Sequence, residues 1–368
     1  MSTRPAGSAT VSARIHARSD KVSEGTMRAV CYDRQGAAGE VLRVREVPTP
    51  EPATGEVRVR IRYSGVNPGD IKKRSGWLGS TMPYPRVIPH SDGAGVIDAA
   101  GEGVDPGRIG QRVWVYGAQS YRPFGTAAEW TVVPSALAVR LPDQVSDEVG
   151  ACLGIPGITA HRAVLGDGPV DGATVLVHGV LGGVGNLAAQ LAHRAGATVI
   201  GTTRRRADLQ ARPPRGVDHL VALDVDDPVD AILGLAPDGV NRIVEVAFSD
   251  NVDLDAAVLR NDGIIAAYAT RDGRPALPFW PMLFGNATIR LLGSDDFPAQ
   301  AKQQAARDLT SAASDGSLTI DISTPMPLEQ AADAHERVTA GTRARVLLHT
   351  RYVSLEASTS SDCRRRGG

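Results

Sequence analysis

Short runs in which apolar and polar residues alternate dominate the first part of the chain. Between residues 57 and 62, two valines and an isoleucine alternate with three arginines, which is the two-residue period of a strand with one buried face. Prolines at 48, 50 and 52 and Gly55 precede this run and indicate turns. We therefore expect a β-rich segment with short strands near 27–33, 41–47, 57–62, 87–88, 95–99, 112–116 and 127–133.

A different pattern begins at about residue 146, where strand-like runs alternate with helix-like runs. Strands separated by helices predict a parallel sheet with helices on both faces. The expected strands are 174–179, 198–203, 220–223, 241–247 and 263–268, and the clearest helix is 183–195. From about residue 290 the pattern is mixed, with expected helices at 298–313 and 327–340 and expected strands at 318–322 and 344–349.

The two patterns predict an α/β protein of two domains, which suits a length of 368 residues. We expect the β-rich domain to comprise residues 27–145 and 290–349, and the domain with the doubly wound parallel sheet to comprise residues 146–289. Residues 1–26 and 350–368 contain few apolar residues, and we expect them to form a disordered leader and a disordered tail.

Composition narrows the possible functions. The net charge is −1, which argues against binding nucleic acid through a broad basic surface. No apolar run approaches the roughly 20 residues that a membrane helix needs, so we expect no membrane partner. Cys31, Cys152 and Cys363 are too few and too scattered for a disulfide framework. This cysteine usage suits a reducing compartment and predicts a cytoplasmic protein.

A cluster of glycines gives the strongest chemical signal. The apolar run 174–177 leads directly into glycines, and the next residues repeat apolar side chains at helical spacing. Such a turn brings the backbone close to a pyrophosphate, and the helix that follows offers free N–H groups to it. Val180 stands where the strict motif has its first glycine, and a packing turn without a ligand is the alternative. The residues expected to contact a dinucleotide here are Gly179, Gly182, Gly183, Val184 and Gly185.

The end of the second strand indicates which dinucleotide is bound. An NAD enzyme usually places an acidic residue there, whereas this chain has Thr203 followed by Arg204 and Arg205. Arginine can grip a 2′-phosphate through paired N–H donors. The sequence therefore predicts NADPH as the cofactor, with an exposed basic turn as the alternative.

Five stretches together resemble the medium-chain dehydrogenase/reductase superfamily, and within it the zinc-free quinone oxidoreductases similar to zeta-crystallin. The stretches are 64–70, 91–97, 154–160, 178–185 and 331–348, and the resemblance extends over about residues 27–349. The family implies a GroES-like catalytic domain, an inserted Rossmann domain and a cofactor cleft between them. It also implies a homodimer, for which an exposed edge strand near residues 260–268 is a candidate.

The resemblance also bears on zinc. Zinc-dependent relatives carry a Cys where this chain has Asn67 and a His where it has Ser91. Catalytic zinc needs about three Cys, His or carboxylate ligands, and two of the expected ligands are missing here. The four-cysteine structural lobe of the superfamily is missing as well. A shifted pair of His90 and Asp92 is an alternative metal site, but we expect no metal.

Candidate catalytic residues lie in the β-rich domain. Asn67 precedes Pro68 and Asp70, a pattern typical of a helix start. The family places the same Asn beside the nicotinamide, and we expect it to serve both roles. Lys72 stands where zeta-crystallin-like enzymes often have Tyr, which leaves the substrate open. Asn67, Lys72 and Tyr116 are the candidates for polarising a substrate carbonyl; a solvated helix face and core packing are the alternatives for the last two.

Three further residues are candidates for cofactor contacts. Thr159 lies in a stretch that runs beside the nicotinamide in the family, and a hydroxyl bonded back to its own helix is the alternative role. Phe248 and Tyr268 follow later strands of the parallel sheet, whose C-terminal ends bind ligands in open α/β folds. His178 has no partner at a spacing that suggests catalysis, and we interpret it as structural.

These features together predict an NADPH-dependent reductase that transfers hydride to a quinone or an α,β-unsaturated ketone. The absence of a metal makes simple alcohol oxidation less favoured. Two alternatives remain open at this point. One is an enoyl reductase of polyketide or fatty-acid type chemistry, and the other is a non-catalytic NADPH-binding protein.

Overall fold

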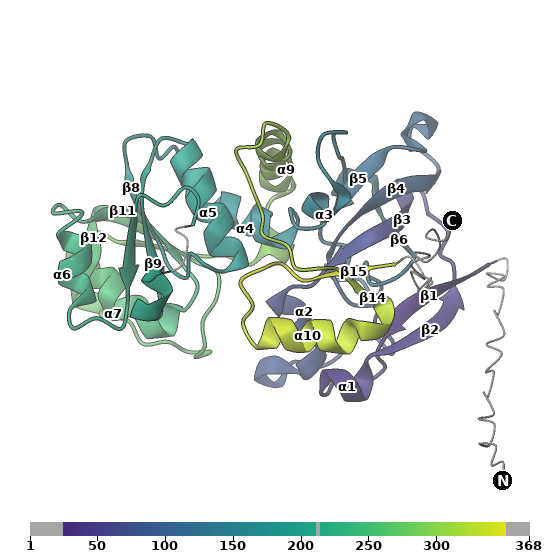
Figure 1. Cartoon of the computed structure of the whole chain (residues 1–368), viewed down its shortest axis with the longest axis horizontal. Helices are drawn as coiled ribbons and strands as arrows, with labels where there is room; N and C mark the ends of the chain where they lie inside the picture. The colour runs from purple at the N-terminus through teal and green to yellow at the C-terminus, as the bar shows by residue number, and fades with distance from the viewer. Residues whose placement is uncertain (1–24, 211–213, 351–368) are drawn as a thin grey trace, which may run out of the picture.

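The computed structural model describes residues 25–210 and 214–350 and contains two large sheets with helices between them (Figure 1). The seven-stranded sheet is mostly antiparallel, with strand order β14-β15-β3-β4-β5-β7 and with β6 paired to β3. Its strands are β3 (Glu56–Gly65), β4 (Asp92–Ala100), β5 (Arg112–Val115), β6 (Trp130–Pro134), β7 (Ala138–Arg140), β14 (Met326–Pro327) and β15 (Leu347–His349). A hairpin of β1 (Thr26–Cys31) and β2 (Arg43–Pro48) lies beside this sheet.

Strand β3 shows why the alternating pattern becomes a strand. Its residues Val57, Val59 and Ile61 are at most 1% exposed and pack into one apolar cluster. Arg58, on the opposite face, pairs with Asp98 of β4 across 2.9 Å. Burial of one face and ion pairing on the other therefore fix the register of this strand.

The second sheet has six parallel strands in the order β10-β9-β8-β11-β12-β13. Val175 and Val177 of β8 pack into an apolar cluster on one face, and Leu176 packs into another cluster on the other face. A sheet buried on both faces requires such continuous apolar runs. The strands are β8 (Thr174–Val177), β9 (Thr198–Thr203), β10 (His219–Ala222), β11 (Val240–Glu245), β12 (Leu259–Ala267) and β13 (Thr288–Leu291).

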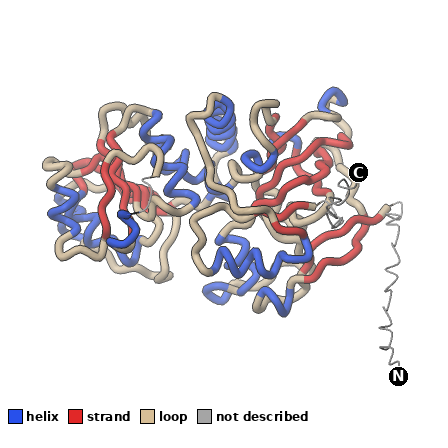
Figure 2. Tube along the Cα trace, viewed as in Figure 1, coloured by secondary structure: helices blue, strands red, loops and turns tan. Residues whose placement is uncertain are grey.

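Helices cover both faces of this parallel sheet and join it to the β-rich part (Figure 2). Strand order reverses between β8 and β11, and ligands of open α/β sheets bind in the crevice at such a point. The helices of this part are α4 (Ile155–Leu165), α5 (Gly183–Arg194), α6 (Pro228–Leu233), α7 (Phe248–Val258), α8 (Phe279–Phe284) and α9 (Ala299–Ser314). The chain then returns through β14 and β15, so the parallel sheet is an insertion into the β-rich part.

The other helices are short and belong to the β-rich part and to the loops. The α-helices are α1 (Ala38–Val41), α2 (Pro68–Ser75), α3 (Asp147–Gly150) and α10 (Ala331–Thr339). The 3-10 helices are η1 (Trp77–Gly79), η2 (Pro106–Arg108), η3 (Ser135–Leu137), η4 (Arg206–Gln210), η5 (Ser294–Asp296) and η6 (Leu328–Gln330).

A pair of buried histidines holds α10 against the β-rich part. The Nε2 atoms of His90 and His335 lie 3.0 Å apart, and the Nδ1 atom of His90 lies 2.8 Å from the hydroxyl of Ser64. Burial lowers the pKa of His90, and burial with nearby Arg74 lowers the pKa of His335 to about 3. Both rings are therefore neutral at neutral pH, which lets one ring donate a hydrogen bond to the other.

The expected fold class is confirmed, with differences in detail. The segment 318–322 forms no strand: Ile322 makes an isolated bridge to Arg345, and the side chain of Gln190 bonds both backbone groups of Thr319. Residues 87–88 likewise form only isolated bridges. Strand β12 is not an edge strand, because β13 pairs with it and forms the edge instead.

The ends of the chain also differ from the expected boundaries. Thr26 already belongs to β1, and Thr350 is buried, with its N–H bonded to the carbonyl of Arg62. The rest of the expected disordered leader and tail, residues 1–24 and 351–368, lies outside the described residues. None of the helices in the described ranges is both long and apolar enough to span a bilayer.

Candidate functional site

The glycine turn lies between β8 and α5 and has a backbone that requires glycine. Gly179 has a φ of 61°, in the left-handed region that favours glycine. A Cβ on Gly185 would lie 2.5 Å from the carbonyl oxygen of Gly179, so any side chain there would force the turn open. The N–H of Gly182 donates to that same carbonyl at 2.8 Å and closes the turn. Helix α5 then begins at Gly183, as the sequence predicts.

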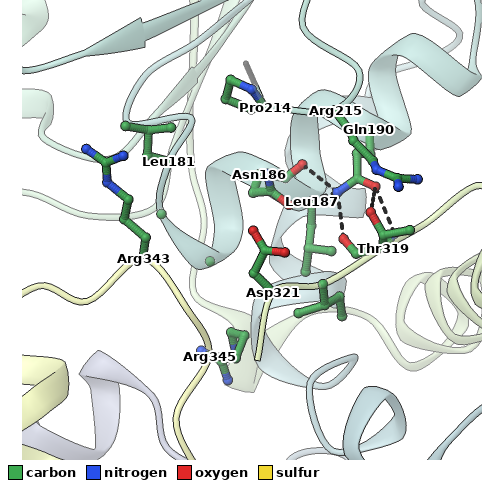
Figure 3. A pocket seen from close by; sticks show the side chains of 13 residues that line it. Leu181, Asn186, Leu187, Gln190, Pro214, Arg215, Thr319, Asp321, Arg343 and Arg345 are labelled. Atoms are coloured by element: carbon green, nitrogen blue, oxygen red, sulfur yellow. Dashed lines mark hydrogen bonds between the residues drawn. The ribbon is translucent and has the colours of Figure 1, made fainter. Parts of the chain in front are cut away.

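A cavity of about 240 Å³ opens at the N-terminus of α5 (Figure 3). Gly182 and Gly183 form part of its wall, and the side chain of Arg345 lies beside Gly183. Three arginines and one aspartate carry the charges of the wall, which makes the cavity net positive. The lining residues are Leu181, Gly182, Gly183, Asn186, Leu187, Gln190, Pro214, Arg215, Thr319, Ile320, Asp321, Arg343 and Arg345.

The structure therefore offers what a pyrophosphate needs at this point. A helix N-terminus provides N–H groups without intrahelical partners and a partial positive charge. The glycines leave room for the phosphate oxygens to reach those N–H groups, and Arg345 adds a guanidinium at the same wall. The residues present fit a dinucleotide whose phosphates lie at the start of α5.

The basic residues that follow β9 do not line the cavity as Arg345 does. Thr203 is buried, and its hydroxyl donates to the carbonyl of Arg205 at 3.2 Å. Arg204 and Arg205 are exposed and are not among the residues that line the cavity. Arg343 does line it, and its guanidinium lies 2.6 Å from Asp208 of η4. Sequence reasoning missed Arg343, because a distant segment brings it to the turn after β9.

Asn67 lies at the centre of a buried hydrogen-bonded chain. It is the N-cap of α2, and its N–H donates to the carboxylate of Asp70 at 2.7 Å, as a helix start of this sequence predicts. Its side-chain Nδ2 donates to Asp92 at 2.7 Å, and its Oδ1 accepts from Arg345 at 2.8 Å. The N–H of Ile155, at the start of α4, donates to the other oxygen of Asp92 at 2.8 Å.

Burial shapes the charges of this chain of residues. Desolvation raises the pKa of Asp92 to about 6 and the pKa of Asp70 to about 7, although hydrogen bonds and Arg345 act in the opposite direction. Each carboxyl is therefore close to taking up a proton near neutral pH. Sequence reasoning considered Asp92 only as half of a metal pair and missed Arg345 completely.

The other two candidate catalytic residues, Lys72 and Tyr116, differ in how accessible they are. Lys72 is half-buried on α2, with its Nζ atom 4.1 Å from the centre of the Trp77 ring, and desolvation lowers its pKa. Tyr116 is 3% exposed and packs against Trp114 with ring centres 5.6 Å apart. The structure thus gives Tyr116 a core position and leaves Lys72 as the more accessible of the two.

The remaining candidates for cofactor contacts are mostly packed. The hydroxyl of Thr159 donates to the carbonyl of Ile155 at 2.7 Å, which is the backward helix bond given above as its alternative role. Phe248 begins α7 and is 4% exposed, with its N–H bonded to the carbonyl of Ala269. Tyr268 is half-buried and packs on the core of α4 and α5.

His178 belongs to a buried polar cluster directly beneath the glycine turn. Its Nε2 lies 2.9 Å from Asp255 and 3.6 Å from Glu245, and its Nδ1 lies 2.9 Å from the hydroxyl of Thr202. The two carboxylates raise the pKa of His178 against the effect of burial. Its sequence neighbours gave no sign of this cluster, since its partners come from β9, β11 and α7.

Comparison with known proteins agrees with this geometry. Residues 53–143 match the family described as the alcohol dehydrogenase GroES-like domain, and residues 183–307 match the family described as zinc-binding dehydrogenase. The human quinone oxidoreductase is 30% identical over 86% of this chain and 95% of its own length, and the mouse protein is 31% identical over 82% and 91%.

Solved structures agree in fold. A mycobacterial quinone oxidoreductase superposes with a TM-score of 0.78 at 26% identity, covering 88% of this chain and 100% of the other. A mycobacterial protein solved with NADPH superposes with a TM-score of 0.75 at 25% identity, with the same coverage. The chain belongs to the zeta-crystallin-like quinone oxidoreductases of the medium-chain dehydrogenase/reductase superfamily and is an oxidoreductase.

Proposed function

We propose that this oxidoreductase transfers hydride from NADPH to a quinone or an α,β-unsaturated ketone and needs no zinc. The observation that carries the proposal is the positively charged cavity at the start of α5, where Arg215, Arg343 and Arg345 meet Gly182 and Gly183. A dinucleotide phosphate is the ligand that this combination of free N–H groups and guanidinium groups favours.

The preference for NADPH over NADH rests on charge. Thr203 gives the ribose no carboxylate, and its hydroxyl is already bonded within the turn. Exposed Arg204 and Arg205 adjoin that position, and Arg343 approaches it from the C-terminal segment through its pair with Asp208. A 2′-phosphate would meet several guanidinium groups there, whereas a free 2′-hydroxyl would gain little. The mycobacterial relative that was solved with NADPH supports the same choice.

The proposal of zinc independence rests on the donor set around Asn67. The amide of Asn67 is held between Asp92 at 2.7 Å and the Arg345 guanidinium at 2.8 Å. A zinc ion would have to bind beside this guanidinium and would find an amide and the Ser91 hydroxyl instead of thiolate and imidazole. These residues do not fit a catalytic zinc site, which needs about three Cys, His or carboxylate ligands.

Without a metal ion, hydrogen bonds from the protein would polarise the carbonyl group of the hydride acceptor. When bound, NADPH supplies a hydride, and the chain positions the acceptor beside it. Asn67 has one amide hydrogen that Asp92 does not take, and Lys72 is a half-buried cation whose pKa is lowered by desolvation. Either group can donate a hydrogen bond to a carbonyl oxygen on which negative charge develops. A conjugated carbonyl suits such a site, because it accepts hydride without a Lewis acid.

Stopped-flow measurement of NADPH oxidation with 1,2-quinones, 1,4-quinones, simple enones and acyl-thioester enoyl substrates tests the proposal. We expect quinones or enones to give the highest kcat/KM. Fastest turnover of enoyl thioesters would instead make the protein an enoyl reductase, and tight NADPH binding without turnover of any acceptor would make it a non-catalytic binding protein.

We also propose a homodimer formed through one edge of the parallel sheet. Strand β13 is one of the two edge strands, the other being β10, and helix α8, which precedes β13 in the chain, exposes Phe279, Trp280 and Phe284 at 57%, 64% and 74%. Large exposed apolar patches of this kind mark interfaces, and an edge strand pairs readily across a two-fold axis. Sedimentation velocity should give a dimer for the wild type and a monomer for Trp280→Glu. Leu235→Glu, at a residue 40% exposed elsewhere, is the matched control and should stay dimeric.

A further inference from the structure

Arg345 occupies a position between the cofactor cavity and Asn67. Its backbone is fixed, because its N–H donates to the carbonyl of Asp321 at 2.8 Å and its own carbonyl accepts from both the N–H and the hydroxyl of Ser323 at 3.0 Å. The residue as a whole is 8% exposed. A guanidinium that is buried on a fixed backbone has few alternative positions, so what it contacts is set by the fold.

One side of the guanidinium faces the glycine turn. Its Nη1 atom lies 3.4 Å from the place where a Cβ on Gly183 would be, and the residue lines the cavity together with Gly182. Nη1 is a charged N–H donor, and such donors form strong hydrogen bonds to phosphate oxygens. A phosphate oxygen at the start of α5 is an acceptor of the right charge.

The other side of the guanidinium holds Asn67. The Nη2 atom donates to Oδ1 of Asn67, and the opposite end of the same amide donates to Asp92. The Asn67 amide therefore lies between Asp92 and Arg345 and is hydrogen-bonded to both. The two ends of the amide have different partners, an acceptor and a donor, so losing either partner removes one of the two contacts that orient it.

We infer that Arg345 is a positioning residue that couples the binding of the cofactor phosphate to the orientation of the Asn67 amide. The inference rests on the proposed function, because it takes the cofactor to bind at the glycine turn. A phosphate that accepts from Nη1 fixes the plane of the guanidinium, and the plane determines where Nη2 presents its hydrogen to Asn67. Coupling of this kind is reciprocal, so a change at Asn67 must also alter the affinity for the cofactor.

A double-mutant cycle tests the coupling. NADPH dissociation constants, and kcat and KM for the best quinone, are measured for the wild type, Arg345→Gln, Asn67→Ala and the double variant. We expect Arg345→Gln to raise the NADPH dissociation constant about tenfold and also to lower kcat at saturating NADPH at least tenfold. Asn67→Ala should raise the NADPH dissociation constant at least threefold, and the double variant should be little worse than Arg345→Gln alone.

Three controls separate positioning from other roles. Arg345→Lys keeps the charge but lacks the planar fork, so it should restore NADPH affinity more than it restores kcat. Arg343→Gln removes another cavity arginine that does not contact Asn67, so it should weaken NADPH binding, keep kcat at saturation, and add independently to Asn67→Ala. Arg194→Gln, near the end of α5 and paired with Asp315, should change neither constant.

The outcomes are distinguishable. Effects of Arg345→Gln and Asn67→Ala that simply add, or an Arg345→Lys variant that restores kcat and affinity equally, would overturn the inference while leaving the proposed function in place. A wild-type protein that bound no NADPH would overturn both. Thermal unfolding of each variant shows that the folded protein is being compared, and if Arg345→Gln did not fold, the cycle with Arg345→Lys would decide.

Discussion

Replacing Gly182 by valine should abolish most cofactor binding while leaving the fold intact. Gly182 is the N-cap of α5, with a φ of −86° and a ψ of 168°, a conformation open to any residue. An added Cβ would lie 3.2 Å from the carbonyl oxygen of Gly179, a tight contact that a small shift of the turn must relieve, and no other atom outside the adjacent residues lies within 4 Å. The new side chain would therefore extend into the cavity and not into the protein core.

The loss of NADPH affinity depends on how many phosphate hydrogen bonds the valine side chain displaces. A phosphate held by charge-assisted hydrogen bonds gains about 1.5–3 kcal/mol from each. Losing one or two such bonds should weaken NADPH binding by roughly 10-fold to more than 1000-fold, at about 1.4 kcal/mol for each factor of ten. The free energy of unfolding should change by no more than about 1 kcal/mol, because a glycine replaced in a compatible conformation also restricts the unfolded chain.

Fluorescence titration with NADPH and thermal unfolding without cofactor measure the two effects separately. Gly185→Ala is the matched control, because its Cβ would lie 2.5 Å from the Gly179 carbonyl oxygen and must distort the turn itself. That variant should lose stability by about 1–3 kcal/mol, as overpacked sites do. A Gly182→Val protein that folds and binds NADPH as tightly as the wild type would show that the phosphates do not lie at this turn.

Three further results are expected. Purified protein should contain no stoichiometric zinc and keep its activity in chelator; activity that disappears with chelator and returns with zinc would contradict the account of Asn67. Replacing Arg204 and Arg205 by alanine should weaken NADPH binding, hardly change NADH binding, and flatten the salt dependence of NADPH affinity in titrations at two salt concentrations; equal wild-type affinities for the two cofactors would show that these arginines are only solvated. The folded-state pKa of His335, about 3 against an ordinary 6.5, means that the unfolded chain binds more protons between these values. The contribution of His335 to the free energy of unfolding should therefore be fully present above pH 6.5 and be lost as the pH drops toward 3, by up to about 1.4 kcal/mol per pH unit. Urea unfolding at pH 7 and pH 5 should show a smaller loss of stability between the two pH values for His335→Gln than for the wild type.

The elements that the sequence predicted well are those determined by residues close together in the chain. Helix α5 begins at Gly183 because glycines, an apolar strand and helical spacing all occur within one short stretch. Strand β3 follows from alternation alone, and the cap at Asn67 follows from Pro68 and Asp70 nearby. In each case the residues that decide the structure are sequence neighbours.

The parts that could not be predicted depend on residues far apart in the chain. Arg345 reaches Asn67, and Arg343 reaches Asp208, only because the C-terminal segment returns across the glycine turn. The segment at Thr319 has a strand-like composition but pairs with the Gln190 side chain instead of with a strand. Single-sequence patterns contain no information on such contacts, so the sequence indicated the glycine turn but not the arginines that the C-terminal segment brings beside it.

The split of the β-rich part has a consequence for biosynthesis. Strand β3 pairs early with β4 and β6, but its pairing with β15 joins Gly65 to Leu347, so the ribosome completes the entire parallel sheet before β15 exists. Until then the nascent chain presents an incomplete sheet edge, and such edges favour aggregation. Contacts of this sequence separation also slow folding. We therefore expect the inserted sheet to fold during translation and the β-rich part to close only after the chain leaves the ribosome. The pairing of β15 with β3 is then the folding step at which aggregation competes most strongly.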